Sequence, residues 1–325
     1  MPLASIILPA YNAEMYISEA IESMLVQSFR DFELLIINDA SSDGTKEKIL
    51  EFQDHRIRYI ENTENLKIAN TLNKGLDLAN GKYIVRMDAD DISHPHRIET
   101  QLDFLERNTS SICCGSWIEI FSTQGKSRIL KLKSNNLNIL HSTILAHPAS
   151  CFRAEFIKEK QIQYKTNAED YYFWNEVYKN NDYKKDTIFN MPKVLLKYRE
   201  HPKQLSSSNK SNIRRDMISV RRKNLLTFLH SHDINFDFNT TTSVNSKDIY
   251  NFLNLKQNLL DNLNYAQTEI LEFYNQTINN FLVSTSKTEL DFIEKALFIK
   301  CLINSDKVIK GMLHILGWST YPIKY

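Results

Sequence analysis

Two aspartates, separated by one residue at the end of an apolar segment, are the residues of this chain best suited to binding a metal ion. Asp88 and Asp90 follow the apolar segment 83–87, and Asp91 comes directly after them. Successive side chains of an extended segment point to opposite faces, so Asp88 and Asp90 are expected to point the same way. Paired carboxylates suit a hard divalent cation such as Mg²⁺ or Mn²⁺. The pattern predicts a metal site at a strand end, although an isolated Asp-x-Asp also occurs in ordinary acidic turns.

A second acidic pair, Glu169 and Asp170, stands immediately before the aromatic segment 171–174. A carboxylate in the first turn of a helix interacts favourably with the positive end of the helix dipole. The same position suits a general base, which must lie where a proton is taken up during a reaction. The residues alone leave both roles open for this pair.

Alternating strand-like and helix-like segments must hold these acids in place. Short apolar runs, typical of buried parallel strands, occupy residues 4–8, 32–37, 57–60 and 83–87, and segments with helical spacing separate them. This alternation predicts an open sheet with helices on both faces, in which ligands bind beyond the carboxyl ends of the strands. Leu8-Pro9, Asn38-Asp39 and Asp88-Ala89-Asp90 stand at three of those ends, so we expect them to converge on one crevice.

Local signals refine this interpretation. Asn12 is predicted to cap the first helix, and Gly81 is predicted to end the third. After residue 112 the pattern becomes less regular, and further strands are predicted at 116–121, 150–153 and 194–198.

The last third of the chain differs in pattern from the rest. Serines 206–208 mark the expected boundary, and helical segments with polar connections follow. We therefore predict a first domain over residues 1–205 and an α-helical region over residues 206–325. Basic and apolar residues mix in the stretch 307–324, which predicts either a helix packed on the first domain, the interpretation that we favour, or contact with an anionic membrane surface.

Composition limits the classes of protein to which the chain can belong. The sequence has 40 basic and 39 acidic residues, and its net charge of +1 argues against nucleic-acid binding. It shows neither a signal-peptide pattern nor an apolar run of about 18 residues. Cys113, Cys114, Cys151 and Cys301 have no C-x-x-C spacing and are expected to be buried thiols in a reducing compartment. A cytoplasmic protein is therefore expected, and peripheral membrane contact stays open.

Five motifs, taken together and in order, carry a resemblance to a known family. They are Pro9-Ala10-Tyr11-Asn12, the segment 38–45, the segment 81–91, Ala168-Glu169-Asp170-Tyr171 and Tyr198-Arg199-Glu200-His201. Over residues 3–205 the chain resembles the inverting GT-A glycosyltransferases of glycosyltransferase family 2. The combination of AEDYYFW with VLLKYREHPKQLSS is most similar to bacterial lipooligosaccharide β-1,3-N-acetylhexosaminyltransferases. The resemblance implies an α/β fold of GT-A type, a Rossmann-like open mixed sheet with flanking helices, followed by a helical C-terminal extension.

The resemblance implies a role for each acidic residue. Asp90 would ligate a divalent cation, Mn²⁺ or Mg²⁺, and Asp88 would contact the cation or the ribose of the donor, next to Ala89. Asp170 would be the catalytic base that takes the proton of the acceptor hydroxyl. Glu169 would bind or orient the acceptor.

The resemblance also implies a nucleotide site. Its expected members are Pro9, Ala10, Tyr11, Asn12, Asp39 and Lys67, with Arg199 and His201 near the diphosphate or the metal. A carboxylate at Asp39 can accept the imide N–H of uracil, which favours a UDP donor. Each assignment has a structural alternative, with Asp39 as a cap, Lys67 as a solvated surface lysine and His201 as a structural histidine.

Neighbours of these residues are expected to support the site. Arg86 lies on the same face as Asp88 and is expected to form a salt bridge with it. The rings of Tyr171, Tyr172 and Trp174 offer a stacking face for a sugar, but the interpretation that we favour places them in the core.

The favoured function is an inverting, metal-dependent transfer of GlcNAc or GalNAc from a UDP-sugar to a hydroxyl group of a surface oligosaccharide, either free or lipid-linked. A nucleotidyltransferase is one alternative, but such enzymes carry a Gly-rich phosphate loop, and residues 9–13 contain no glycine. A catalytically silent nucleotide-sugar-binding module is the other, and the presence of both Asp90 and Asp170 argues against it. Acceptor, linkage and oligomeric state are left unpredicted.

Overall fold

The structure, a computed structural model, describes residues 1–122, 125, 127–134, 136–165, 168–202, 204 and 210–232, together with 259, 263, 268–270, 272 and 273. The chain divides into two compact units, Met1–Arg222 and Lys223–Tyr325. The predicted boundary after residue 205 precedes helix α8 (Lys210–Ser231), which runs across the division between the units. The predicted domain limits stay a prediction.

Nine strands of the described residues form one sheet in the order β3-β2-β1-β4-β8-β6-β9-β5, with β7 paired to β6 outside this path. The strands are β1 (Ala4–Ala10), β2 (Phe32–Asn38), β3 (Ile57–Glu61), β4 (Tyr83–Arg86), β5 (Ile92–Ser93), β6 (Cys113–Ser122), β7 (Ser127–Leu130), β8 (Cys151–Arg153) and β9 (Ile188–Glu200). The first four strands pair with one another in parallel, as predicted, and β6 is parallel to β9. The other pairs are antiparallel, so the sheet is mixed.

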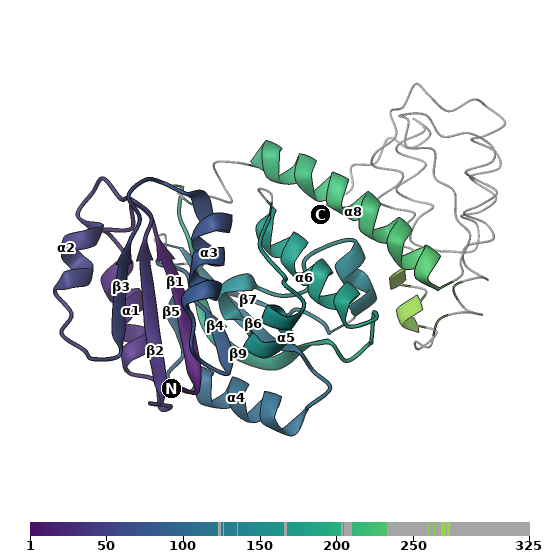
Figure 1. Ribbon diagram of the computed structural model, residues 1–325, viewed down its shortest axis with the longest axis horizontal. Helices are drawn as coiled ribbons and strands as arrows, with labels where there is room; N and C mark the ends of the chain where they lie inside the picture. Colours follow the sequence, from purple (N-terminus) through teal and green to yellow (C-terminus); the bar gives the residue numbers. More distant parts are fainter. Residues whose placement is uncertain are drawn as a thin grey trace. The chain divides into compact units, whose positions relative to one another are not determined.

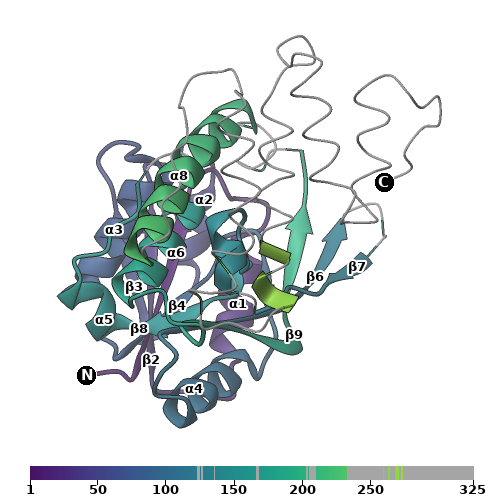
Figure 2. The same ribbon diagram turned by 90° about the vertical axis from the view of Figure 1, so that its right-hand side faces the viewer.

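The second half of the sheet departs from the sequence prediction. Strand β9 extends over 13 residues instead of the predicted 194–198, even though it contains Pro192. The register of its pairing with β6 shifts on either side of Trp117, so two regular segments are joined at an irregularity that the apolar pattern does not reveal. Strand β7 was not predicted, because all four of its residues are exposed and it has no buried face. In Figure 2, β6, β7 and β9 extend to one side of the sheet.

Seven α-helices and two 3-10 helices lie wholly within the described residues. They are α1 (Ile17–Leu25), α2 (Thr45–Leu50), α3 (Lys67–Leu78), α4 (Arg97–Arg107), η1 (Asn136–Leu140), η2 (His147–Ala149), α5 (Ala154–Glu159), α6 (Glu169–Asn180) and α8. Helices cover both faces of the sheet, as predicted (Figure 1). On one face Ile6 and Leu8 of β1 pack in a core with Ile21 of α1 and Ile98 of α4. On the other face Gly75 of α3 comes so close to β1 that an added Cβ would lie 2.5 Å from Ile7 Cγ2.

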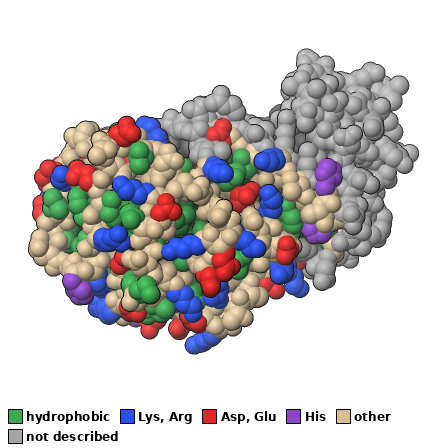
Figure 3. All heavy atoms as spheres, viewed as in Figure 1, with side chains coloured by type: hydrophobic (Ala, Val, Ile, Leu, Met, Phe, Trp, Pro, Cys, Tyr) green, Lys and Arg blue, Asp and Glu red, His purple; other side chains and the backbone are tan. Residues whose placement is uncertain are grey.

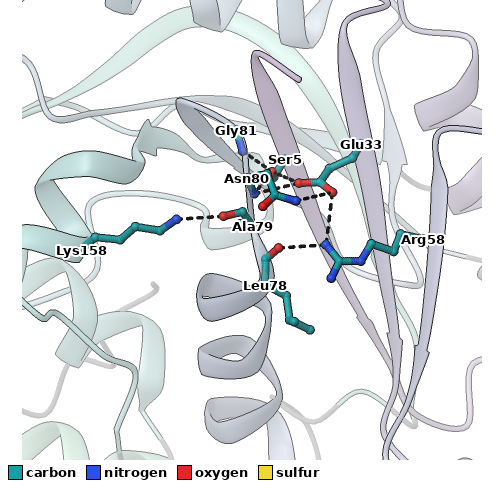
Figure 4. Close-up of polar contacts among 8 residues, drawn as sticks. All are labelled: Ser5, Glu33, Arg58, Leu78, Ala79, Asn80, Gly81 and Lys158. Carbon is teal, nitrogen blue, oxygen red and sulfur yellow. Dashed lines mark hydrogen bonds and ion pairs between the residues drawn. The ribbon is translucent and has the colours of Figure 1, made fainter. Parts of the chain in front are cut away.

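The amino ends of β1, β2 and β4 are joined by a polar network that fixes the turn between α3 and β4 (Figure 4). Ser5 Oγ donates to Glu33 Oε1 at 2.5 Å and accepts from the backbone N–H groups of Asn80 and Gly81 at 3.1 and 2.8 Å. Arg58 donates to the backbone oxygen of Leu78 at 3.0 Å. The network satisfies backbone groups at the end of α3, and it sets where β4 begins and hence where Asp88 lies.

The predicted role of Gly81 as the residue that ends this helix was wrong. Helix α3 ends at Leu78, and Ala79 is its C-cap in an extended conformation. Gly81 is required for a different reason, because a Cβ at this position would lie 2.5 Å from the backbone nitrogen of Ser5 and 2.6 Å from the carbonyl carbon of Ala4. The constraint is the close approach of the turn before β4 to the start of β1, which a sequence pattern does not show.

Gly81→Ala is expected to destabilise the first unit by about 3 kcal/mol, because the clashing atoms are backbone and one strand must move. The urea midpoint of unfolding, followed by circular dichroism, measures the change. Gly44→Ala is the matched control, since its new Cβ would meet only the side chain of Glu14, which can rotate away. Equal midpoints for the two variants would contradict the prediction.

The described surface carries charges of both signs. On the face shown in Figure 3, Lys and Arg side chains are interspersed with Asp and Glu, which agrees with the net charge of +1. Cys113, Cys114 and Cys151 are buried free thiols, as predicted. Among the helices that the structure describes, none combines the length and apolar composition that a bilayer crossing requires.

A few buried apolar side chains are described in the second unit. Its buried side chains include Leu225, Phe228, Leu229, Leu259 and Phe273. Helix α8 agrees with the helical pattern predicted from about residue 211. Cys301 and the stretch 307–324 lie outside the described residues.

Candidate active site

The three aspartates that follow β4 form a compact acidic cluster. Carboxylate oxygens of Asp88, Asp90 and Asp91 lie within 4.8 Å of one another. Asp88 and Asp90 are half-buried, and Asp91 is buried. Arg86, the last residue of β4, donates from Nη2 to Oδ1 of Asp88 at 2.5 Å, so the predicted salt bridge is confirmed.

The protein balances the negative charge of the acidic cluster only in part. Burial, and next the charge of Asp88, raises the pKa of Asp90. Burial raises the pKa of Asp91 well above its usual value, and Asp88 and Asp90 add to the rise. Oδ2 of Asp91 is buried without a hydrogen-bond partner among the described residues. Crowded carboxylate oxygens that lack counter-charge suit a hard divalent cation, so the residues present fit Mg²⁺ or Mn²⁺.

The end of β9 contacts the acidic cluster from a distant part of the chain. His201 Nε2 lies 2.9 Å from Oδ2 of Asp90, and the His201 ring packs on Tyr16 with ring centroids 4.8 Å apart. The backbone N–H of Arg199 donates to Oδ1 of Asp91 at 2.9 Å, and Arg199 Nε donates to the backbone oxygen of Asp90 at 2.8 Å. The structure therefore brings both residues predicted near the diphosphate to the acidic cluster.

Arg199 is already held by several partners. Its Cζ lies 4.7 Å from the ring centroids of both Tyr16 and Phe121, and its Nη2 lies 2.9 Å from Oε2 of Glu19. Arg199 is buried and Glu19 is exposed. These contacts hold the end of β9 against α1, and a phosphate group would have to share the guanidinium with Glu19. A direct phosphate contact by Arg199 stays a prediction.

Asp39 is buried at the carboxyl end of β2, where it binds the start of α3. Its Oδ1 accepts from Asn62 Nδ2 at 2.7 Å and from the backbone N–H of Leu66 at 2.9 Å, and its Oδ2 accepts from the N–H of Lys67 at 3.0 Å. Asp39 therefore caps the start of α3, which is the structural role that the sequence left open for it. The cap leaves further acceptor capacity on Oδ2, because each carboxylate oxygen has two lone pairs and Oδ1 already accepts two hydrogen bonds.

The loops that follow β1 and β2 are bonded to each other. The backbone N–H of Ser42 donates to Asn12 Oδ1 at 2.9 Å, and the N–H of Ala13 donates to Thr45 Oγ1 at 2.8 Å. The predicted role of Asn12 as a helix cap was wrong, because α1 begins after Tyr16 without a side-chain cap and the Asn12 side chain is used between the loops.

Three non-glycine residues in and near these loops have left-handed backbone conformations. The φ angles are +49° at Asn12, +55° at Ala40 and +70° at Lys67. Such conformations cost free energy and concentrate at functional sites, where the surrounding structure enforces them. The other predicted nucleotide-site members also lie here, with Pro9 and Ala10 buried at the end of β1 and the side chain of Tyr11 exposed.

The second acidic pair begins α6 and lies within electrostatic reach of the acidic cluster. Burial, and next the charge of Asp170, raises the pKa of Glu169 to about 8. Burial also raises the pKa of Asp170. The hydrogen bond from the Tyr171 N–H, at 2.6 Å, acts in the opposite direction and lowers this pKa. The charge of Asp88 adds to the rise at both carboxyl groups. Two acidic motifs far apart in the sequence are thus brought together.

The rings at the start of α6 belong mainly to the core, as favoured. Tyr171 and Trp174 are fully buried, whereas Tyr172 is half-buried. The ring of the buried His147 lies 5.4 Å from Trp174 and 5.3 Å from Tyr164, and burial holds the pKa of His147 well below its usual value. Of these rings at the helix start, only Tyr172 offers exposed area to a ligand.

Sequence reasoning missed three residues that support the site. They are Tyr16, Glu19 and Phe121. Phe121 ends the predicted strand 116–121, so its place at a carboxyl end of the sheet was a usable signal. The other two lie in ordinary helix sequence, and only the folded chain brings them to Arg199.

Comparison with known proteins identifies relatives of this chain. Residues 5–182 match the family described as glycosyl transferase family 2. An uncharacterized glycosyltransferase of Haemophilus influenzae is 32% identical over 96% of this chain and 97% of its own length. The Escherichia coli protein WfgD, a UDP-Glc:α-D-GlcNAc-diphosphoundecaprenol β-1,3-glucosyltransferase, is 32% identical over 66% of this chain and 83% of its own length.

Solved structures share the fold. Staphylococcus aureus TarS, residues 1–349 in complex with UDP-GlcNAc, superposes with a TM-score of 0.57 at 17% identity, covering 93% of this chain and 80% of that chain. The mannosyltransferase PcManGT of Pyrobaculum calidifontis, in complex with GDP-Man and Mn²⁺, superposes with a TM-score of 0.52 at 14% identity, covering 98% and 84%. These similarities confirm the predicted GT-A fold.

Proposed function

Because the chain belongs to glycosyl transferase family 2, we propose that it transfers a sugar from a UDP-sugar to a hydroxyl group of a surface oligosaccharide, with inversion at the anomeric carbon. One observation carries the inverting mechanism. A half-buried carboxylate, Asp170, lies within electrostatic reach of Asp88, which belongs to the acidic cluster. A single displacement needs a base near the acceptor and charge stabilisation near the leaving group, and this arrangement supplies a candidate for each.

The proposed step is a direct substitution. The acceptor oxygen bonds to the anomeric carbon while the bond from that carbon to the diphosphate oxygen breaks, and Asp170 takes the hydroxyl proton as UDP leaves. A divalent cation held by Asp90, with Asp88, would stabilise the negative charge of the leaving diphosphate. Burial raises the pKa of Glu169 to about 8, which favours the protonated carboxyl group, and in that form Glu169 can donate a hydrogen bond to the acceptor.

Donor and acceptor are narrower parts of the proposal. The motifs of the chain favour an N-acetylhexosamine, GlcNAc or GalNAc, whereas the E. coli relative is named as a glucosyltransferase. That relative is also named for a diphosphoundecaprenol-linked acceptor, which supports including lipid-linked acceptors beside free galactoside-terminated glycans. We propose that the reaction takes place on the cytoplasmic side of the membrane, where such precursors meet UDP-sugars.

A UDP-release assay with Mn²⁺ tests the proposal. A panel of UDP-GlcNAc, UDP-GalNAc, UDP-Glc and UDP-Gal is combined with free and lipid-linked acceptors, and the product linkage is read by NMR. Acceptor-dependent UDP release with a β-linked product is expected from one donor. An α-linked product would overturn the single displacement. Metal-dependent UDP binding without turnover on any acceptor would favour a silent binding module.

Asp39→Asn is expected to weaken UDP binding by about tenfold or more. The substitution replaces one of the two accepting carboxylate oxygens with an NH₂ group, which donates and cannot accept the imide N–H of uracil. Isothermal titration with UDP and Mn²⁺ measures the affinity. The loss should be smaller for ADP, whose base lacks an imide.

The second role of Asp39 as a cap of α3 needs its own control. Thermal unfolding without nucleotide separates lost capping from lost recognition. Asp43→Asn is the matched variant, since Asp43 accepts from the N–H and hydroxyl of Thr45 at 3.1 and 2.5 Å and from the N–H of Glu14 at 3.2 Å. Equal losses for UDP and ADP in Asp39→Asn would mean that the residue is only structural.

A further inference from the structure

The start of α1 directs two side chains at the end of β9. Tyr16 is the N-cap of α1 and Glu19 lies three positions later, so their side chains are neighbours on the helix surface. The Tyr16 N–H donates to the backbone oxygen of Ala13 at 2.9 Å, and the Ala13 N–H donates to Thr45 Oγ1 at 2.8 Å. The backbone at Tyr16 is therefore tied to the two loops of the predicted nucleotide site.

The ring of Tyr16 contacts both side chains that reach the acidic cluster from the end of β9. Its centroid lies 4.8 Å from that of the His201 ring and 4.7 Å from Arg199 Cζ. Phe121 lies at the same distance from Arg199 Cζ. Among the residues that the structure describes, Tyr16 alone has its ring against both side chains. A guanidinium over an aromatic ring is held there by cation–π attraction.

Two routes lead from the Tyr16 ring to the acidic cluster. The first passes through His201, whose Nε2 lies 2.9 Å from Asp90 Oδ2. The second passes through Arg199, whose Nε donates to the backbone oxygen of Asp90 at 2.8 Å and whose N–H donates to Asp91 Oδ1 at 2.9 Å. The side chains of His201 and Arg199 are only 10% and 9% exposed, so these contacts are largely shielded from water.

We propose that Tyr16 is a positioning residue of the donor site, which holds His201 and Arg199 against Asp90 and so sets the geometry in which UDP and a divalent cation bind together. The inference rests on the proposed function, in which the acidic cluster holds the cation of a UDP-sugar. His201 lies one residue beyond the end of β9, so strand pairing does not fix its ring. Groups that orient the neighbours of a metal ligand typically change metal affinity by about tenfold to a hundredfold.

Tyr16→Leu is expected to weaken UDP binding in the presence of Mn²⁺ by about tenfold, because both routes lose their common ring. UDP affinity measured in EDTA should stay within about twofold of the wild type, since only the cation-dependent part relies on these routes. Tyr16→Phe keeps the ring and should bind UDP with Mn²⁺ as the wild type does. Isothermal titration with UDP, with Mn²⁺ and with EDTA, measures both affinities.

Phe121→Leu tests the two routes separately. It removes one ring from Arg199 and leaves the contact between Tyr16 and His201 in place. Its loss of UDP affinity with Mn²⁺ should therefore be smaller, about threefold. Equal losses in Tyr16→Leu and Phe121→Leu would mean that His201 has no part in the effect, and would overturn the inference.

A double-mutant cycle measures the coupling between Tyr16 and His201 directly. If Tyr16 acts through His201, the loss of affinity in Tyr16→Leu/His201→Ala should be smaller than the product of the two single losses. A loss equal to that product would contradict the coupling. Phe189→Ala removes another ring that packs at β9, stacked on Phe104 with centroids 4.6 Å apart, and should leave UDP affinity unchanged.

The same titrations separate a failure of the inference from a failure of the function. Wild-type UDP affinity with Mn²⁺ in Tyr16→Leu, with a normal circular dichroism spectrum, would overturn the inference and leave the function intact. Absence of Mn²⁺-dependent UDP binding in the wild type would instead refute the donor site on which it rests. Tyr16→Met, whose flexible side chain fills similar space without a ring, takes the place of Tyr16→Leu if that variant does not fold.

Discussion

Asp170→Asn is expected to lower kcat for sugar transfer by about a thousandfold or more, while UDP and donor affinity stay close to those of the wild type. A positioned general base contributes roughly two to four orders of magnitude, and Asn cannot take a proton. Asn keeps the shape of Asp and can still accept from the N–H of Tyr171, so α6 should form normally. Acceptor-dependent UDP release and isothermal titration with UDP measure the two halves of this expectation.

The pH dependence gives a second test of the same residue. Burial raises the pKa of Asp170, and a base acts only when it is ionised. Wild-type activity should therefore rise with pH through a value above the ordinary range of an aspartate, and Asp170→Asn should lose this limb. A cation bound to Asp88 and Asp90 will offset the part of the rise caused by Asp88 but not the part caused by burial.

The control for this prediction lies on the same helix. Glu176→Gln alters a carboxylate that forms an ion pair with Lys179, at 3.9 Å, and should retain wild-type rates. If Asp170→Asn keeps more than about a tenth of the wild-type kcat, another group is the base, and Glu169 is the nearest candidate.

Asp90→Asn is expected to remove the Mn²⁺ dependence of both UDP binding and turnover, with kcat/KM reduced by about a hundredfold or more. The reason is that Asp90 belongs to the crowded acidic cluster, whose charge the protein leaves partly uncompensated. An amide is a weak ligand for a hard cation compared with a carboxylate. Titration of UDP with and without Mn²⁺ separates the metal-dependent part of the affinity from the rest.

Thermal unfolding provides a readout that does not depend on activity. A cation that binds only the folded protein raises the unfolding temperature, so Mn²⁺ should stabilise the wild type and not Asp90→Asn. Asp103→Asn, at an exposed position of α4, is the control and should respond to Mn²⁺ as the wild type does. An equal stabilisation of wild type and Asp90→Asn by Mn²⁺ would place the cation elsewhere.

Strands β1, β2 and β4 were predictable because they are buried almost throughout and mainly apolar, and their parallel order follows from the helices between them. Strand β3 has no fully buried residue, but its short apolar run between two helical segments was enough to predict it. The acidic ends of β2 and β4 then had to lie at one edge of the sheet. Strand β7 could not be predicted, because it is exposed along its whole length and is held by pairing with β6 alone.

The order of the motifs determined the family of this protein, and alternation along β4 placed Asp88 on the face of Arg86. The motifs can be recognised in the sequence itself, and the alternation along a strand depends only on residues two positions apart. Only the tertiary structure decided which distant groups complete the site. His201 reaches Asp90, Arg199 reaches Asp91, and Asp39 binds the start of α3. Such contacts join segments whose separation in sequence has no periodic signature, and they depend on how the strands and helices pack.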